Sequence, residues 1–330
     1  MNKSVWVELL KSNAVVTDAY LKAIGAAYEK LGYDVNYVYN CLACGCKSSD
    51  IYVVGIAPSA AKLRIKGAKH IVFWAQGIWP EESFLRNDNK TAYWLCSRIE
   101  RFALKSSDHV FAVSKAQVRH YEGKYGLDLV SRSYVMPCSN ETFHAESFFV
   151  EGKYEHPVFV YAGSLAKYQC VDKMLDAFSR IQKAEPSAEF LFYTAQQDEA
   201  RSLVSSMGLK NVTVSYAEPD RLNEVLARAK YGFVIRDDST VNRVATPTKI
   251  SSYISNGVIP VFSESLEAFF ESSKGIVRPP YRESSIDMDF LMLERERISA
   301  DRMFAEYREY FEREFDYANR ISDICDFLRG

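Results

Sequence analysis

The sequence lacks the features that would place the chain in a membrane or on nucleic acid. Lysine and arginine (41 residues) nearly balance aspartate and glutamate (43 residues), and the net charge of −2 gives no general case for nucleic acid as a partner. No apolar run reaches the roughly 18 residues of a membrane-spanning helix. The sequence also has no internal repeat and no low-complexity segment. Its composition, 48% hydrophobic and 25% charged, is that of a globular protein, and 330 residues are enough for two domains.

Cysteine is sparse as well. Seven cysteines, an odd number in a chain of this length, favour reduced thiols in the cytosol over a disulfide framework. Cys41, Cys44 and Cys46 are spaced C-x-x-C-x-C, but the sequence offers no evident fourth ligand. We interpret them as free loop thiols, with a zinc or iron–sulfur site as the alternative. The opening residues, MNKSVWVELLKSN, lack the apolar core and cleavage site of a signal peptide, so we expect a cytoplasmic protein.

Glycine is missing from the first predicted strand-to-helix loop, KSNAVV (11–16). A dinucleotide-binding Rossmann site needs G-x-G-x-x-G there, so that the backbone can approach the pyrophosphate. The sequence therefore argues against such a site. Short apolar segments separated by helical patterns still predict the α/β class with parallel strands. The predicted strands are 4–10, 34–39, 51–55, 70–76, 109–113, 134–136, 157–162, 189–194, 212–216, 231–235, 258–262 and 275–277.

The strand–helix series divides in two at a polar segment, 141–156, which has several charges and no clear period. We interpret this segment as a linker. It separates an N-terminal domain over residues 1–145 from a second domain over residues 155–305. The final segment, 298–328, is helical in period throughout, with many charges and aromatic residues.

The stretch from residue 236 to residue 257, RDDSTVNRVATPTKISSYISNG, lies between two predicted strands. Thr246 is a suitable N-cap for a helix, and Pro247 at the first helical position gives up no hydrogen bond. Gly257 is a suitable residue to end the helix. The stretch therefore predicts a loop followed by a short helix between two buried strands.

The start of this helix has the properties of an anion site. The N–H groups of Thr248, Lys249 and Ile250 lie in the first turn, where a helix has no internal acceptors for them. The helix dipole favours negative charge at the same place, and Lys249 adds a full positive charge. Asn242 and Arg243 are expected in the preceding loop. Within this stretch we therefore predict a binding site for an anion.

A strand ending in Arg236, a loop, P-T-K, a helix and then G-x-x-P-V resembles the donor site of retaining GT-B glycosyltransferases of family four. The resemblance covers nearly the whole chain and is clearer in the second half. It implies two Rossmann-like parallel-sheet domains facing each other across a cleft, with a C-terminal helix, from about residue 310 to 330, returning to the first domain. It also implies that a nucleoside diphosphate sugar binds the second domain and that the sugar passes to a glycan or lipid-linked acceptor with retention.

The resemblance assigns the donor diphosphate to the P-T-K turn, with Arg236 and Lys249 as the residues that support catalysis. A second donor loop follows the first strand of the second domain. The donor-side candidates are Gly163, Ser164, Lys167, Tyr168, Asn242, Arg243, Pro247, Thr248, Ile250 and Ser252. The family usually has arginine at the position of Ser164, so this loop matches the family pattern only in part. Enzymes of this fold generally need no metal ion, and we interpret Asp237 and Asp238 as polar loop residues.

Two further departures from the family pattern concern Gln76 and Ser252. Gln76, a third candidate catalytic residue, stands where a histidine–glycine pair is common; glutamine hydrogen-bonds but moves no proton. Gly77 and Trp79, in the loop that Gln76 opens, are the candidates on the acceptor side. Ser252 stands where a glutamate usually contacts the nucleotide ribose, and we expect Ser252→Glu to be tolerated. Two alternatives therefore stay open. One is a catalytically silent homologue that partners an active enzyme, and the other is a sugar-nucleotide epimerase, whose carboxylates and histidine we cannot place.

The segment 91–106, TAYWLCSRIERFALKS, combines Trp94 and other apolar residues with Arg98, Arg101 and Lys105. Such a helix is typical either of a core-facing element with a solvated basic face or of a surface that contacts anionic lipid. We expect a peripheral position at the inner face of a membrane as one interpretation of this pattern.

Overall fold

The computed structural model describes residues 3–10, 15–139, 141–274, 276, 280–282, 284–295 and 297–330. The chain forms two compact units. The first comprises residues 1–140, 243–246 and 312–330, and the second comprises residues 141–242 and 247–311. The C-terminal segment therefore belongs to the unit in which the chain begins.

A six-stranded parallel sheet forms the centre of the first unit, in the order β2-β1-β3-β4-β5-β6. Its strands are β1 (Ser4–Glu8), β2 (Asp34–Val38), β3 (Ile51–Val54), β4 (His70–Ala75), β5 (His109–Ala112) and β6 (Ser133–Val135). The helices are α1 (Val15–Lys30), α2 (Ala57–Ile65), α3 (Trp79–Asn87), α4 (Lys90–Ser106), α5 (Lys115–Tyr125) and α14 (Tyr317–Arg329). Every residue of β3 is buried, as expected for a parallel strand with helices on both faces.

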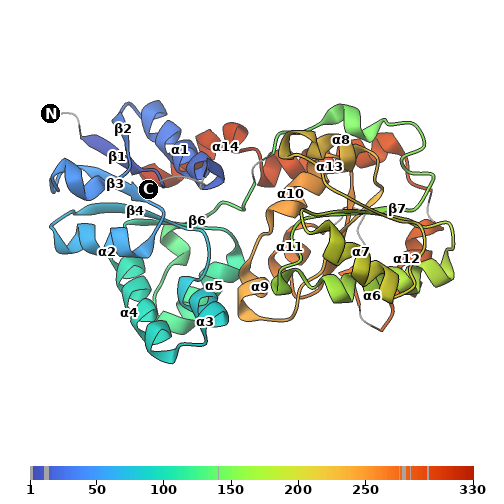
Figure 1. Cartoon of the computed structure of the whole chain (residues 1–330). Helices are drawn as coiled ribbons and strands as arrows, with labels where there is room; N and C mark the ends of the chain where they lie inside the picture. Colours follow the sequence, from blue (N-terminus) through green and yellow to red (C-terminus); the bar gives the residue numbers. More distant parts are fainter. Residues whose placement is uncertain are drawn as a thin grey trace. The chain divides into compact units, whose positions relative to one another are not determined.

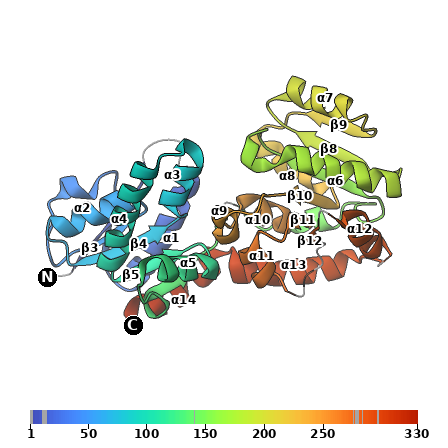
Figure 2. The same cartoon turned by 90° about the horizontal axis from the view of Figure 1, so that it is seen from below.

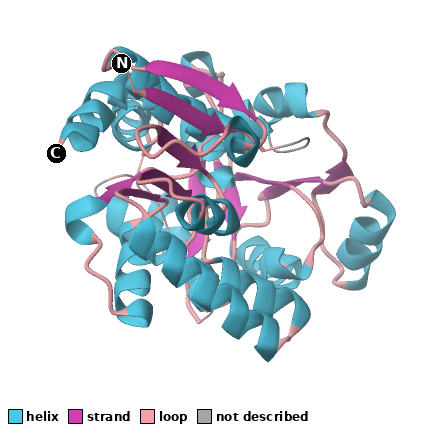
Figure 3. Ribbon diagram, turned by 90° about the vertical axis from the view of Figure 1, so that its left-hand side faces the viewer, coloured by secondary structure: helices cyan, strands magenta, loops and turns pink. Residues whose placement is uncertain are grey.

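The second unit is built in the same way, on a sheet with the order β12-β11-β10-β7-β8-β9. Its strands are β7 (Val158–Ala162), β8 (Glu189–Tyr193), β9 (Val212–Ser215), β10 (Tyr231–Val234), β11 (Ile259–Ser263) and β12 (Pro280–Tyr281). Its helices are α6 (Val171–Ala184), α7 (Gln197–Ser206), α8 (Leu222–Ala227), α9 (Thr240–Val244), α10 (Thr248–Ser255), α11 (Glu267–Ser272), α12 (Ile286–Glu294) and α13 (Ala300–Glu314). The last residues of α9 and of α13 are grouped with the first unit. Helices surround the strands (Figure 3). The predicted α/β class with two parallel sheets is confirmed.

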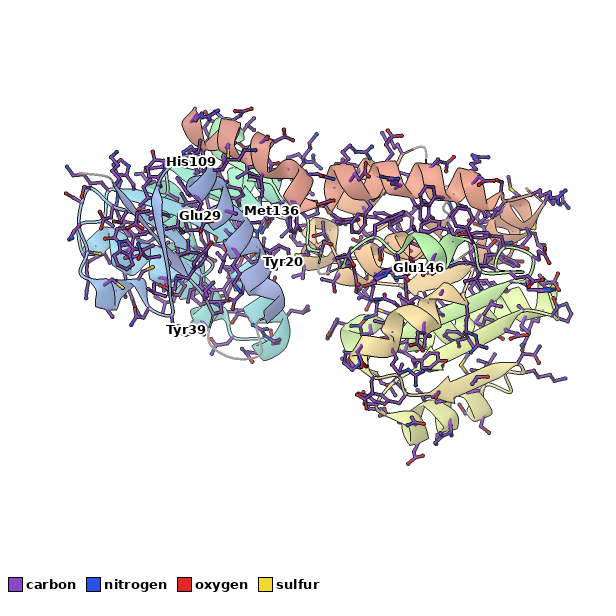
Figure 4. The ribbon with its side chains drawn as sticks, turned by 90° about the horizontal axis from the view of Figure 1, so that it is seen from above. Tyr20, Glu29, Tyr39, His109, Met136 and Glu146 are labelled. Atoms are coloured by element: carbon purple, nitrogen blue, oxygen red, sulfur yellow. The ribbon has the colours of Figure 1, made fainter. Side chains whose placement is uncertain are left out.

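The core of the first unit joins segments that are far apart in the chain. Tyr20 on α1 and Met136 just after β6, both labelled in Figure 4, are fully buried together with Ile324 on α14. Figure 1 shows α14 beside α1. Arg320 of α14 also donates to the carbonyl of Val135 at 2.7 Å. These contacts make α14 part of the first unit's core.

Aromatic side chains fill the core of the second unit. The Phe159 ring on β7 stacks against Tyr231 at 4.9 Å and against Phe233 at 5.1 Å between ring centroids. Figure 2 shows α13 running alongside α11, where Ser272 and the Tyr310 hydroxyl are hydrogen-bonded at 2.8 Å. Sheet and helices are therefore packed into one body within this unit.

The structure corrects three expectations about elements. The segment 298–328 is not one helix: α13 ends at Glu314 and α14 begins at Tyr317, because the Asp316 side chain accepts from the N–H of Asn319 and caps a new helix. Trp79 does not lie in a loop but begins α3. The last strand is Pro280–Tyr281, and the predicted strand 275–277 lies outside the described residues.

Among the described helices, none is long and apolar enough to cross a membrane.

Candidate functional site

The predicted anion site lies at the start of α10, between β10 and β11. The helix begins one residue later than the sequence suggests, because Pro247 is extended (ψ 131°) and occupies the N-cap. Thr246 does not cap it; its Oγ1 accepts from the Cys138 N–H at 2.9 Å. The Ile250 N–H is also not free, since it donates to the Pro247 carbonyl at 2.9 Å. The first-turn donors are therefore those of Thr248 and Lys249.

Lys249 projects from this first turn towards the turn that follows β7. Its Nζ lies 2.9 Å from the place that a Cβ of residue 163 would occupy, so a side chain at Gly163 would require the Lys249 side chain to move. The same Nζ lies 5.2 Å from the centre of the Tyr161 ring. Burial and the nearby charge of Arg236 lower the pKa of Lys249 to about 8.

Arg236 follows β10 and lies close enough to Lys249 to influence its charge. The side chain is 8% exposed, and its Nη1 donates to the Ile235 carbonyl at 2.8 Å. The backbone is held on both sides, since the Arg236 N–H donates to Ser263 and its carbonyl accepts from Ser265. Burial lowers the pKa of the guanidinium. Arg236 is thus a buried cation in a fixed position.

No carboxylate within the described part of the chain forms an ion pair with Arg236 or Lys249. Two cations that approach one another without a counter-charge raise the free energy of the empty site. An anion bound between them would relieve this repulsion. The electrostatics of the α10 turn are therefore those of a site for a multiply charged anion.

The turn after β7 contributes the other donor-side candidates. The Tyr161 hydroxyl donates to the Ser164 carbonyl at 2.7 Å and so shapes the turn around Gly163. Lys167 and Tyr168 follow in a short 3-10 helix (Lys167–Gln169), and both are exposed. The guanidinium carbon of Arg236 lies 5.9 Å from the Tyr168 ring centre. The structure thus brings Gly163, Tyr168, Arg236 and Lys249 together in one unit.

Other donor-side candidates have structural partners of their own. The Asn242 side chain donates to the Asp237 carbonyl at 2.8 Å, which holds the loop before α9. Asp237 forms an ion pair with Lys173 at 2.9 Å. This contact lowers the pKa of Asp237, and its effect is larger than the opposing effect of burial. Arg243 is exposed and is grouped with the first unit. Over the described residues, no cluster of three or more His, Cys, Asp or Glu side chains is arranged to hold a metal ion.

The thiols of Cys41, Cys44 and Cys46 are free, and Cys41 is buried. Cys41 Sγ donates to the Trp6 carbonyl at 3.7 Å, and Cys44 Sγ donates to the Asn40 carbonyl at 3.7 Å. Cys41 and Cys44 therefore each have a backbone carbonyl as partner.

Ser252 lies one turn beyond Lys249 on α10. Its side chain is 8% exposed, and its hydroxyl lies 2.9 Å from Oε1 of Glu141 and 3.3 Å from the Thr248 carbonyl. Glu141 was placed in the linker by the sequence and had no predicted role. Its pairing with Ser252 joins residues that are 111 positions apart, and no local sequence pattern reports such a contact.

The acceptor-side candidates lie at the carboxyl end of β4 in the first unit. Gln76 is exposed, and the Gly77 carbonyl accepts from the Tyr121 hydroxyl at 2.7 Å. A Cβ at Gly77 would lie 2.0 Å from Oε1 of Glu82, so a side chain here would displace the Glu82 carboxylate. The Trp79 N–H donates to Oε1 of the buried Glu100 at 3.1 Å. Side chains of α4 and α5 thus hold the loop that the sequence proposed as functional.

The sequence does not reveal the buried role of Glu100, because in sequence it is one more polar residue of the basic helix. It is 1% exposed, and its Oε2 accepts from the Tyr125 hydroxyl at 2.7 Å. Burial raises its pKa to about 7, although the bonds from Tyr125 and Trp79 favour the ionised form. Its position on the inner face of an amphipathic helix is the signal that could have identified it.

No family model matches the chain, and no curated protein matches it in sequence. Several solved structures are nevertheless similar to it in fold. Sucrose-phosphate synthase from Thermosynechococcus elongatus has a TM-score of 0.71 at 12% identity, with 99% of this chain and 98% of that one covered. HepE from Anabaena, in complex with UDP-glucose, has a TM-score of 0.66 at 12% identity, with 100% and 99% covered.

A third similar structure is longer than this chain. It is a mutant of S. aureus TarM in complex with fondaparinux, α-GlcNAc-glycerol and UDP, with a TM-score of 0.60 at 9% identity. The match covers 86% of this chain but only 56% of TarM, so the chain spans little more than half of that protein. At these identities the comparisons establish the architecture. Two parallel six-stranded sheets and a C-terminal helix that returns to the first unit give this chain the GT-B fold of glycosyltransferases.

Proposed function

We propose that the protein is a glycosyltransferase that moves a sugar from a nucleoside diphosphate sugar to a glycan or lipid-linked saccharide, with retention of anomeric configuration. The observation that carries the proposal is the pair of cations, Arg236 and Lys249, which meet without a counter-charge beside Gly163. When a diphosphate leaves an anomeric carbon, negative charge develops on its oxygens. Fixed cations and oriented N–H groups stabilise that charge.

Each residue of the site has a distinct role in this proposal. Lys249 and the first-turn N–H groups of α10 bind the diphosphate, and Arg236 adds a second charge from a rigid position. Gly163 leaves room for the Lys249 side chain and for the ligand. Gln76 orients an acceptor hydroxyl by hydrogen bonding and does not act as a base. Because two fixed cations supply the positive charge, we propose that transfer needs no metal ion.

Solved structures of the same fold are consistent with this donor class. HepE is described with UDP-glucose bound, and the TarM mutant with UDP. Neither shows which base, sugar or acceptor this chain uses. The donor class proposed here therefore rests first on the charges of the α10 turn.

We further propose that the enzyme works as a peripheral protein at the inner face of a membrane. On α4, Trp94 (59% exposed) and Phe102 (40% exposed) lie beside the basic residues of the same helix. They line a hollow of about 720 Å³ together with Arg98, Arg101 and Lys105. Cations beside exposed aromatic rings suit an anionic lipid surface, where a lipid-linked acceptor would be met.

A panel of nucleotide sugars tests the donor assignment. A ligand present at about one hundred times its dissociation constant adds roughly 2.7 kcal/mol to the free energy of unfolding, which raises the melting temperature. Acceptor-dependent release of the nucleotide then tests transfer. Donor binding without release would favour the silent homologue. Interconversion of the donor sugar without an acceptor would favour the epimerase. Absence of any donor binding would contradict the transferase, the silent homologue and the epimerase alike.

Lys249→Ala tests the site itself. A charge-assisted contact to phosphate contributes roughly 1.5–3 kcal/mol, so we expect donor affinity to fall about ten- to a hundredfold by calorimetry. The melting temperature should not fall, because the folded protein holds this cation at a lowered pKa.

Lys115→Ala is the matched control, since Lys115 is an exposed lysine in the first turn of α5. It should leave donor affinity unchanged. A lower melting temperature with normal donor affinity in Lys249→Ala would mean that Lys249 is a structural residue.

A further inference from the structure

A carboxylate lies one helical turn beyond the proposed phosphate site. Glu141 Oε1 accepts from the Ser252 hydroxyl at 2.9 Å, and only 14% of the Glu141 side chain is exposed. Glu141 follows the first unit directly in the chain and belongs to the second unit, as does Ser252. A partly buried carboxylate is costly unless it has partners, and one serine hydroxyl uses little of its capacity to accept.

The surroundings of Glu141 hold its carboxylate in place and leave part of its capacity to accept hydrogen bonds unused among the described residues. The His144 N–H donates to the Ser255 carbonyl at 2.9 Å, which fixes the chain after Glu141 against α10. His144 Nε2 is 3.9 Å from Glu141 Oε2, beyond hydrogen-bond distance, and it has no hydrogen-bond partner within the described residues. The short helix that follows carries Glu146, labelled in Figure 4. Glu141 is therefore an oriented acceptor with free lone pairs.

The distance along α10 suits a nucleotide. Ser252 is three residues beyond Lys249, so it lies on the same face and about 4.5 Å further along the helix axis. In a nucleoside diphosphate, the ribose follows the phosphates directly and carries two adjacent hydroxyl groups. A carboxylate can accept from both hydroxyls at once.

We propose that Glu141, held by Ser252, accepts hydrogen bonds from the 2′- and 3′-hydroxyls of the ribose of a nucleotide whose diphosphate lies at Lys249. The inference rests on the proposed function and deepens it, because it makes the site selective for ribonucleotides. The carboxylate comes from the segment after β6 and not from α10 itself. The structure therefore also changes the expectation for Ser252→Glu: a second carboxylate beside Glu141 would be repelled and would weaken nucleotide binding.

The test measures ribose selectivity in the full chain by calorimetry. The probes are UDP, ADP and GDP, each with its 2′-deoxy counterpart, and inorganic pyrophosphate. In the unaltered protein we expect the ribonucleotide that binds best to bind about ten times more tightly than its 2′-deoxy form. In Glu141→Gln, which preserves size and one acceptor oxygen, this preference should fall below about threefold while pyrophosphate binding is unchanged.

A double variant supplies a second measurement that does not depend on the first. Glu141→Gln with Ser252→Glu moves the carboxylate onto α10, and we expect it to restore the ribose preference that Glu141→Gln loses. A merely structural contact would lower the melting temperature but would leave the ribose preference intact in Glu141→Gln.

The two failures can be told apart. If the unaltered protein binds none of the six nucleotides, the proposed function fails, and the ribose assignment fails with it. If a nucleotide binds but the unaltered protein shows no ribose preference, or Glu141→Gln keeps that preference, the donor site stands and the role of Glu141 is overturned.

Discussion

Lys249 lies half-buried over the Tyr161 ring, and burial together with Arg236 lowers its pKa to about 8. A bound diphosphate would favour the charged form and raise this pKa. Donor binding above pH 8 must therefore take up a proton, and the donor affinity should fall by up to about tenfold per pH unit above that value. Calorimetry between pH 7 and pH 9 measures the slope.

Lys249→Arg is the control for this pH dependence, because arginine stays charged throughout the range. Titration of the nucleotide itself is common to both proteins and cancels in the comparison. An equal slope in the unaltered protein and in Lys249→Arg would show that Lys249 does not bind the diphosphate.

Glu100 also titrates, and it gives a second prediction, which concerns the pH dependence of the free energy of unfolding. Its pKa of about 7 in the folded protein is above its usual value, so the folded state keeps a proton that the unfolded chain releases. The stability that this proton provides is complete below the usual pKa and is lost as pH rises through 7, by about 3 kcal/mol. Glu100→Gln resembles the protonated form and should remove this loss.

Tryptophan fluorescence suits the measurement, because all four tryptophans (Trp6, Trp74, Trp79 and Trp94) belong to the first unit. Urea unfolding at pH 5.5 and pH 8.5 should show a smaller difference in Glu100→Gln than in the unaltered protein. Glu151→Gln, at an exposed glutamate of the second unit, should show no such change. Equal pH dependence in all three proteins would mean that Glu100 ionises normally.

At the scale of single elements, α4 is where the membrane proposal is tested. Changing Arg98, Arg101 and Lys105 to glutamine removes three charges from its outer face and leaves the buried residues intact. We expect binding to vesicles that contain anionic phosphatidylglycerol to be salt-sensitive and to fall by about tenfold or more, at roughly 1 kcal/mol per charge. Co-sedimentation with the vesicles measures this.

Two controls accompany the α4 experiment. Vesicles of phosphatidylcholine alone should bind both proteins weakly. Changing the exposed Arg201, Arg221 and Arg313 to glutamine removes the same total charge from other surfaces and should have little effect. Equal loss in both triple variants would show that net charge, and not the face of α4, controls binding.

The elements that the sequence predicted well are those with strong local signals. Apolar strands such as β4 and β11, bounded by polar residues, lie within one residue of their predicted ends. Helix boundaries were less certain because they depend on competition for hydrogen bonds. Thr246 has the side chain of an N-cap, but its hydroxyl bonds to Cys138, and this partner is 108 positions away in the chain.

The charged residues of the candidate site could be predicted from the sequence, but the contacts that hold them in place could not. Lys249 and Gly163 could be proposed from the patterns around them. The close approach of the Lys249 side chain to Gly163 appears only when β7 and α10 are packed together. Glu141 was interpreted as linker, since nothing in a polar segment reveals that its carboxylate returns to Ser252.

At the scale of the whole molecule, the last helix completes the first unit. Ile324 and Cys325 of α14 are buried in the same core as Tyr20 and Trp74, and the Tyr317 hydroxyl donates to the Pro137 carbonyl. The core of the first unit therefore contains residues from both ends of the chain. It cannot close until the last helix has been added, whereas the second unit is continuous apart from residues 243–246.

Ile324→Ala tests this dependence. Removing a fully buried isoleucine side chain costs about 2–5 kcal/mol, so the free energy of unfolding of the first unit, measured by tryptophan fluorescence in urea, should fall by that amount. Arg329→Ala is the control on the same helix, because Arg329 is exposed and pairs with Asp326 of the same helix, at 2.9 Å. It should change the free energy of unfolding by less than about 1 kcal/mol. If Ile324→Ala unfolded at the same urea concentration as the unaltered protein, the first unit would not depend on α14 for its core.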